Sequence, residues 1–106
     1  MKTGDVGEEL IFIVKEKKTI NGKIEISIMN LTNVLKAELI YRGYKVTYIK
    51  ECDILEPKTS GKVKYIVESG DFPREYIYNA QIKLTFIDGD VFYTDKFSIV
   101  VDGVIG

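Results

Sequence analysis

The chain has 106 residues, 45% of them hydrophobic, and its 15 basic and 16 acidic residues leave a net charge of −1. This length and composition indicate one folded domain over residues 1–106, with its ordered part at about 9–101. Because the charge is balanced and Arg42 and Arg74 are the only arginines, the sequence excludes a surface built to grip nucleic acid or an anionic membrane.

The missing residue types exclude most catalytic chemistry. The chain has no histidine, which removes the commonest general base and the commonest transition-metal ligand. Cys52 is the only cysteine, so no disulfide can form within the chain. The acidic residues are scattered singly rather than paired as in a glycosidase. We therefore predict a protein that is not an enzyme, with no catalytic residues, no metal site and no cofactor.

The first strand signal runs from Glu9 to Ile20 and is followed by Asn21-Gly22, the strongest short hairpin signal. After this turn, isoleucines alternate with polar residues, at positions 24, 26 and 28. A period of two predicts a strand with one buried face and one wet face.

Asn30-Leu31-Thr32 interrupts the alternation and allows two interpretations. The triplet matches an N-glycosylation acceptor, which requires an exposed asparagine and would place the chain outside a cell. Asparagine and threonine are also ordinary turn residues. Asn30 is therefore a candidate glycosylation site, with a plain turn as the alternative.

The middle of the chain predicts three more strands. Residues 34–41 place Leu35, Ala37, Leu39 and Tyr41 on one side, and residues 44–49 place Tyr44, Val46 and Tyr48 on one side. After a connection that contains Pro57, a further strand alternates Val63, Tyr65 and Val67.

The last two strand signals are the clearest. Residues 78–86 alternate strictly and end at the turn pair Asp88-Gly89, where a turn is favoured over a calcium site. The final strand places Val91, Tyr93, Phe97, Ile99 and Val101 on one face, with an interruption at Asp95. About seven strands without helical periodicity predict an all-β antiparallel β-sandwich of immunoglobulin-like type, with a small closed barrel as the alternative.

Tyrosines give the most informative site predictions. Tyr78, at the start of the sixth strand, is interpreted as a structural residue of the tyrosine-corner kind. Other tyrosines cluster on neighbouring predicted strands. Further aromatic and aliphatic residues occupy positions of the alternation whose side chains should face water. Exposed apolar side chains of this kind favour a protein-binding surface. Burial under a loop or a different register are the alternatives. The candidate partner-binding residues are Tyr41, Tyr44, Tyr48, Ile49, Phe92 and Val100.

Residues 9–101 resemble an immunoglobulin-like or fibronectin type III-like module. The resemblance is carried by "NLTN", "LEPKTSGKVKYIV" and "YNAQIKLTF" with its Asp-Gly hairpin, although the antibody cysteine pair and tryptophan are missing. In its composition, rich in isoleucine, lysine and tyrosine, the chain is also similar to the soluble portions of archaellum accessory proteins. That resemblance implies a membrane-anchored stator component of the archaeal motility machinery.

The leading hypothesis is an interaction or assembly module on the extracellular side or in the envelope of an archaeal cell. Its partner would be an envelope protein or another copy of the chain, and a membrane would be reached only through an anchor upstream of residue 1. The alternative from another class is a carbohydrate-binding module, in which Arg42, Lys45, Asn79 and Gln81 would flank exposed tyrosines. An intracellular adaptor is a further alternative, if Met1 is the native start of the chain.

Overall fold

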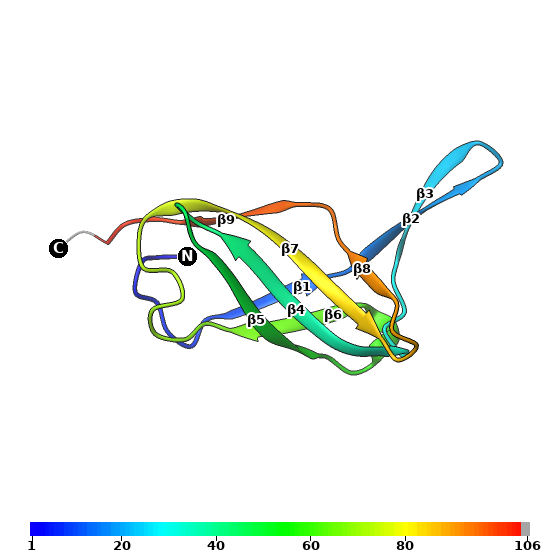
Figure 1. The fold of residues 1–106 in the computed structure, drawn as a ribbon, viewed down its shortest axis with the longest axis horizontal. Helices are drawn as coiled ribbons and strands as arrows, with labels where there is room; N and C mark the ends of the chain where they lie inside the picture. Colours follow the sequence, from blue (N-terminus) through cyan, green and yellow to red (C-terminus); the bar gives the residue numbers. More distant parts are fainter. Residues whose placement is uncertain (105–106) are drawn as a thin grey trace.

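The computed structural model describes residues 1–104 and confirms the predicted all-β, antiparallel, sandwich-like fold (Figure 1). One curled sheet has the strand order β1-β6-β5-β4-β7-β8, and β9 pairs with the other end of β7. A separate two-stranded sheet contains β2 and β3. The strands are β1 (Glu9–Ile13), β2 (Lys15–Ile20), β3 (Lys23–Ile28), β4 (Val34–Arg42), β5 (Thr47–Ile54), β6 (Lys62–Ile66), β7 (Tyr76–Phe86), β8 (Val91–Tyr93) and β9 (Phe97–Val101).

The sheet folds over at the junction of β5 and β6. These strands share only the pairs Asp53↔Lys64 and Ile54↔Val63, so the sheet turns a corner there. As a result β1 and β6 cross behind β4 and β5 (Figure 1). Phe12 of β1 contacts Phe97 of β9 across the core, with ring centroids 5.1 Å apart.

The core lies between the two halves of the curled sheet and follows the predicted alternation. Strand β7 buries every second side chain from Tyr78 to Leu84, and β4 does the same from Ala37 to Tyr41. The largest fully buried side chains are Tyr41, Tyr78, Leu31, Leu39, Ile82, Leu84, Val14, Val63 and Val101.

The prediction that Leu35 lies on the core side of its strand is wrong. The register between β4 and β7 shifts between Val34 and Lys36, where β4 carries an irregularity of the bulge type. Val34 is therefore buried, whereas the Leu35 side chain is 69% exposed. One extra residue in a strand moves the following side chains to the opposite face.

The prediction of one continuous last strand is also wrong, for the same physical reason. Tyr93 pairs with Lys83, and Phe97 pairs with Ala80, so three residues lie opposite two on β7. Thr94 fills the gap: its N–H donates to the Ile82 carbonyl at 3.0 Å, and its Oγ1 accepts from the Ile82 N–H at 2.9 Å. The extra residue reverses the parity, so Val91 and Tyr93 point outward while Ile99 and Val101 remain buried.

The strand predicted to begin at Tyr44 begins at Thr47 instead. Residues 43–46 form a loop in which Lys45 has a φ of 62° and the Gly43 N–H donates to the Val46 carbonyl at 3.0 Å. Tyr44 and Val46 therefore lie on an exposed loop rather than on a strand face.

The N-terminal residues, which precede the predicted ordered range 9–101, form hydrogen bonds with the residue that follows β9. The Thr3 N–H donates to the Asp102 carbonyl, and the Asp102 N–H donates to the Met1 carbonyl, both at 2.8 Å. These bonds attach the N-terminus to the end of β9. Residues 105–106 of the predicted domain lie outside the described residues.

The β2–β3 hairpin projects away from the body (Figure 1). The molecule measures 54 × 28 × 22 Å and has a radius of gyration of 15.2 Å. A compact domain of this length has a radius of gyration of about 13 Å, so the hairpin extends the molecule. Asn21 and Gly22 have φ values of 52° and 76°, which confirms the predicted turn. The predicted burial of one hairpin face is wrong within this chain, because all six residues of β3 are exposed.

Candidate interaction surfaces

Tyr41, a predicted partner-binding residue, lies in the core with 0% of its surface exposed. Its ring stacks between Tyr48 and Phe72, with centroid distances of 4.8 Å and 4.6 Å. Its hydroxyl donates to the Asp71 carbonyl at 2.7 Å. The loop that follows β6 therefore covers Tyr41, and this position removes it from any partner-facing surface of the folded chain.

Asp71 is the buried polar centre of that loop, with 3% of its surface exposed. Its Oδ2 accepts hydrogen bonds from the Tyr65 hydroxyl and from the Glu68 N–H, the latter at 2.8 Å. Its Oδ1 lies 2.9 Å from the Lys50 ammonium. Burial alone would raise the pKa of Asp71, but these donors outweigh it and hold the pKa below the ordinary value of 3.8. No sequence motif marks this arrangement, since Asp71 lies in a loop of ordinary turn residues.

Tyr78 has the structural role that the sequence predicted. Its buried ring packs edge-on against Tyr41 and Phe72, and its hydroxyl donates to the Arg74 carbonyl at 3.1 Å. Burial raises the pKa of the Tyr78 hydroxyl, which therefore keeps its proton and donates it in this hydrogen bond. The bond to a backbone group four residues upstream is the arrangement expected of a tyrosine corner.

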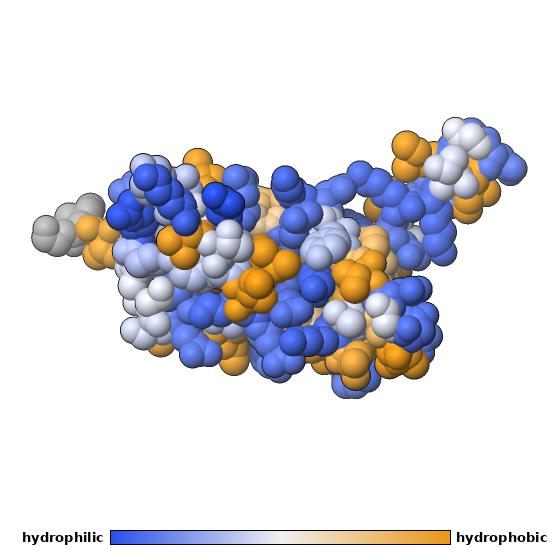
Figure 2. All heavy atoms as spheres, in the orientation of Figure 1, coloured by the Kyte–Doolittle hydropathy of each residue, from blue (hydrophilic) through white to orange (hydrophobic). Residues whose placement is uncertain are grey.

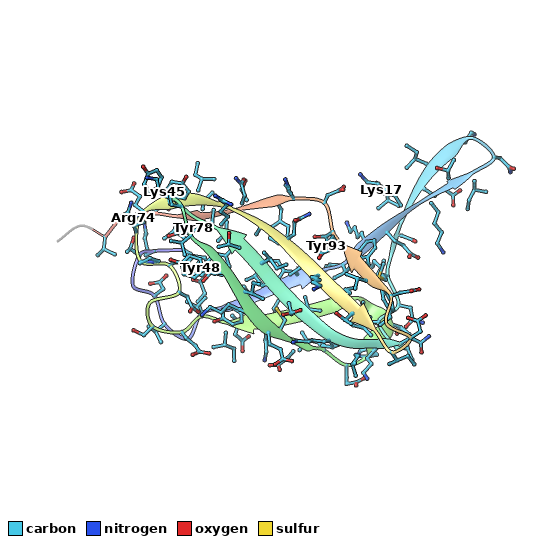
Figure 3. All side chains as sticks on the ribbon, in the orientation of Figure 1. Lys17, Lys45, Tyr48, Arg74, Tyr78 and Tyr93 are labelled. Atoms are coloured by element: carbon cyan, nitrogen blue, oxygen red, sulfur yellow. The ribbon has the colours of Figure 1, made fainter. Side chains whose placement is uncertain are left out.

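Tyr44 and Tyr48 border one end of the molecule. Tyr44 is 58% exposed and Lys45 lies over its ring, 5.1 Å from the centroid, whereas Tyr48 is half-buried against Tyr41. Both line a hollow of about 270 Å³ with Arg74 and Tyr78. Figure 3 shows Tyr48, Tyr78 and Arg74 together at this end of the molecule. These two tyrosines form a small surface apart from the remaining predicted residues.

Ile49 and Val100 lie on the outer face of the sheet but do not form one apolar patch. Ile49 pairs with Ile40, and Val100 pairs with Ile77. Between these pairs runs a polar cross-strand row, Thr47–Arg42–Asn79–Ser98. The structure therefore separates the predicted aliphatic residues on this face.

The polar row contains two of the four residues predicted for carbohydrate binding, Arg42 and Asn79. Arg42, Asn79 and Gln81 line a hollow of about 250 Å³ on the outer sheet face, whereas Lys45 lies over the Tyr44 ring instead. The remaining lining residues are Ile40, Thr47, Ala80 and Lys96. None of these lining residues is aromatic, so the hollow has no ring on which a sugar could stack.

The apolar face of the hairpin is the most exposed aliphatic surface that the alternation had predicted to be buried. Ile24, Ile26 and Ile28, here named the isoleucine row, are 71%, 62% and 52% exposed. Their cross-strand neighbours on the same face are Thr19, Lys17 and Lys15. Hydrophobic side chains stand out on the hairpin in Figure 2, away from the body.

Phe92 contributes to the base of this hairpin surface. Because Phe92 pairs with buried Leu84, its side chain turns inward and packs against the core. It nevertheless lines a hollow of about 390 Å³ together with Ile26 and Tyr93, between the hairpin and β8. Lys17 and Asp95 also line this hollow, and the Lys17 ammonium lies 2.7 Å from the Asp95 carboxylate. Lys17 and Tyr93 are labelled in Figure 3. Of the six predicted partner-binding residues, Phe92 is the one that lines a hollow together with a member of the isoleucine row.

Asn30 is exposed between β3 and β4, at the break where the sequence placed it. Its Oδ1 accepts from the Thr32 N–H at 3.0 Å and from the Thr32 hydroxyl at 2.5 Å. The adjacent Leu31 is fully buried and anchors the segment. Asn30 therefore has the exposure that glycosylation requires. Its side chain also makes the local hydrogen bonds that are typical of a turn.

Cys52 is buried on β5, and burial raises the pKa of its thiol to about 12. Among residues 1–104, no cluster of three acidic or thiol side chains is placed to hold a metal ion. The described part of the chain also contains no helix with the length and apolar character that crossing a bilayer requires. Comparison with protein families, curated proteins and solved structures gives no match.

Proposed function

We propose that this chain is a non-enzymatic interaction module that binds protein through the isoleucine row of its projecting hairpin. The observation that carries the proposal is a period-two row of isoleucines, more than half exposed, on an arm that extends from the body. Alternation of this kind is typical of a strand that buries one face. Among residues 1–104 more than half of each isoleucine in the row stays uncovered, so a partner is the natural cover.

The energy available from covering the row is large for so small a surface. The exposed parts of Ile24, Ile26 and Ile28 together equal roughly two whole isoleucine side chains. Burying that much aliphatic surface contributes about 3–6 kcal/mol, before the cost of ordering the partners. The charged residues of the opposite hairpin face, among them Lys18 and Glu25, keep that face in water.

The outer hollow supports the carbohydrate-binding alternative less well. Its polar side chains could satisfy hydroxyl groups, but sugar-binding surfaces of the predicted type need an aromatic platform. Tyr44, the exposed tyrosine nearest to that expectation, lies on the loop at the end of β4 and does not line the hollow. Protein binding through the hairpin is therefore the better-supported function.

A narrower form of the proposal places the module on the outside of an archaeal cell, as part of the archaellum or another envelope assembly. Its support is the compositional resemblance and the exposed Asn30. Mass spectrometry of the protein from its native cells would test this setting. A glycan on Asn30 supports it, and an unmodified Asn30 removes that support.

Site-specific photo-crosslinking in native cells tests the proposed surface. A photoreactive residue replaces Ile26, and the matched control carries it at Lys18, on the opposite face of the same hairpin. We expect a protein adduct of defined mass from position 26 and little from position 18. Equal adducts from both positions, or none from either, would overturn the proposal.

A further inference from the structure

We propose that the partner of the hairpin is the hairpin of a second copy. The two β3 strands would pair edge to edge, antiparallel, about a two-fold axis at Ile26. This inference rests on the proposed function and names the partner of the same surface. It follows from the free backbone edge of β3, from the charge pattern along that edge and from the projection of the arm.

The backbone groups of the isoleucine row point toward the free edge of β3. A two-residue turn makes its flanking pair, Ile20↔Lys23, a hydrogen-bonded pair, and the pattern alternates from there. Lys23, Glu25 and Ser27 therefore direct their N–H and C=O groups to β2. The N–H and C=O groups of Ile24, Ile26 and Ile28 point outward, away from β2. Among residues 1–104, these backbone groups take part in no hydrogen bond outside the strand ladders.

This edge lacks several of the devices that normally protect an edge strand. Strand β3 contains no proline and no bulge, and its charged side chains, Lys23 and Glu25, lie on the face opposite the isoleucines. An unprotected edge of this kind is a template for pairing with another strand.

Charge and length favour an axis at Ile26 over the neighbouring axes at Glu25 and Ile24. An axis at Glu25 places that carboxylate opposite its own copy, which is unfavourable. An axis at Ile24 leaves only three residue pairs, 23–25 of each copy, before the turn residue Gly22 would have to pair. An axis at Ile26 pairs residues 24–28 of both copies and sets Glu25 opposite Ser27.

In that register the isoleucines of the two copies are cross-strand neighbours. Ile24 lies opposite Ile28 of the second copy, and Ile26 lies opposite its own equivalent. Three isoleucines from each copy then form one continuous aliphatic strip, and such pairs are the stabilising units of a sheet.

The other free edge of the hairpin is less suited to pairing. On β2, an axis at Lys17 or Lys18 places a lysine opposite its own equivalent. Lys17 is also engaged with Asp95 of its own body. The lysines of β2 thus disfavour the competing edge and leave β3 available.

The shape of the molecule permits the pairing. The hairpin extends away from the body, so antiparallel arms place the two bodies at opposite ends of the joint sheet (Figure 1). An isolated two-stranded hairpin is marginally stable in water, whereas a four-stranded sheet gains pairing on both central strands. Association would therefore stabilise the arm as well as join the copies.

Sedimentation velocity over a hundredfold concentration range, with proline variants, tests the pairing. Ile26→Pro removes an outward N–H from the β3 edge, whereas Thr19→Pro places the same residue on the β2 edge as the matched control. We expect a reversible dimer, a dissociation constant at least about tenfold higher for Ile26→Pro, and a change within about twofold for Thr19→Pro. A strict monomer, or equal weakening by both variants, would overturn the pairing.

Cysteine cross-linking tests the register itself. Directly opposed residues of a hydrogen-bonded pair have Cα atoms about 5.5 Å apart, within the range of a disulfide. We expect Ile26→Cys to form a disulfide dimer under mild oxidation. Ile24→Cys and Ile28→Cys should each fail alone but cross-link when mixed. Cys52 is buried and does not compete. Cross-linking of Ile24→Cys alone at the rate of Ile26→Cys would overturn the register.

The outcomes separate this inference from the proposed function. A monomeric chain whose position 26 photo-crosslinks to a different protein would overturn self-pairing and leave the interaction module standing. A chain that forms neither dimers nor adducts would overturn both.

Discussion

Replacing Asp71 with asparagine should destabilise the domain because the buried carboxylate satisfies three donors at once. One oxygen faces the Lys50 ammonium, and the other accepts from the Tyr65 hydroxyl and the Glu68 N–H. An asparagine amide has one oxygen and one NH₂ group, so either orientation sets a donor against a donor. Tyr41 still donates to the residue 71 carbonyl, so the loop keeps one attachment.

The expected loss for Asp71→Asn is about 2–4 kcal/mol of unfolding free energy at neutral pH. Removing one partner of a buried charge pair costs about 3–5 kcal/mol, and the 32% exposure of the Lys50 side chain reduces that figure. Urea unfolding measures the difference, with Asp53→Asn on exposed β5 surface as the matched control. The control should change by less than about 0.5 kcal/mol.

The pH dependence of unfolding, compared between wild type and Asp71→Asn, tests the same contribution. The pKa of Asp71 is lower in the folded state than the ordinary value of 3.8, so its contribution is fully present above that value. As the pH falls through the folded-state pKa, the native carboxylate is protonated and the contribution is lost. The stability gap between wild type and Asp71→Asn should therefore narrow below about pH 3.8. A gap that is absent at neutral pH, or constant to pH 2, would refute the reasoning.

Two further predictions concern packing, and denaturant unfolding checks both. Gly43→Ala should lower the unfolding free energy by about 1–3 kcal/mol, because its Cβ would lie 2.6 Å from Cε1 of Tyr78. That ring is packed in the core and held by its hydrogen bond to Arg74. An unchanged unfolding midpoint would mean that the ring moves freely. Leu39→Ala should cost about 2–5 kcal/mol, whereas Leu35→Ala should cost less than about 0.5 kcal/mol; equal losses would show that the two leucines share a face.

Local patterns predicted the parts of the fold that depend on local chemistry. Asn21-Gly22 supplied the positive φ values of a tight turn, and the alternation around Ile82 and Leu84 identified a strand with one core face. The role of Tyr78 was also readable, because a tyrosine at a strand start has a known way to satisfy its hydroxyl.

The errors arose where one residue changes the parity of a strand. The irregularity before Lys36 and the extra residue around Thr94 leave no mark in hydrophobic periodicity, yet each moves the following side chains to the other face. Leu35, Val91 and Tyr93 were misplaced for this reason. Tyr41 was misassigned differently, because the loop around Asp71 covers it and a strand pattern contains no information about loops that return over it.

The exposed isoleucine row shows that a hydrophobic pattern can report burial that a single chain does not provide. The alternation of residues 24–28 predicted a buried face correctly only if the assembly, not the monomer, is the folded unit. Backbone hydrogen exchange separates these cases residue by residue. In the hairpin of one chain, the N–H groups of Glu25 and Ser27 face β2, whereas those of Ile24, Ile26 and Ile28 face solvent.

A dilute monomer should therefore protect the amides of residues 25 and 27 weakly and those of the isoleucine row hardly at all. Raising the concentration should slow exchange at Ile24, Ile26 and Ile28 selectively, because these amides become the bonds of the β3 pair. Residues of β7 such as Ile82 should not change, since their protection comes from the core. If the isoleucine amides exchange at the same rate at every concentration while dimers form, then the copies meet elsewhere and the β3 edge is not the interface.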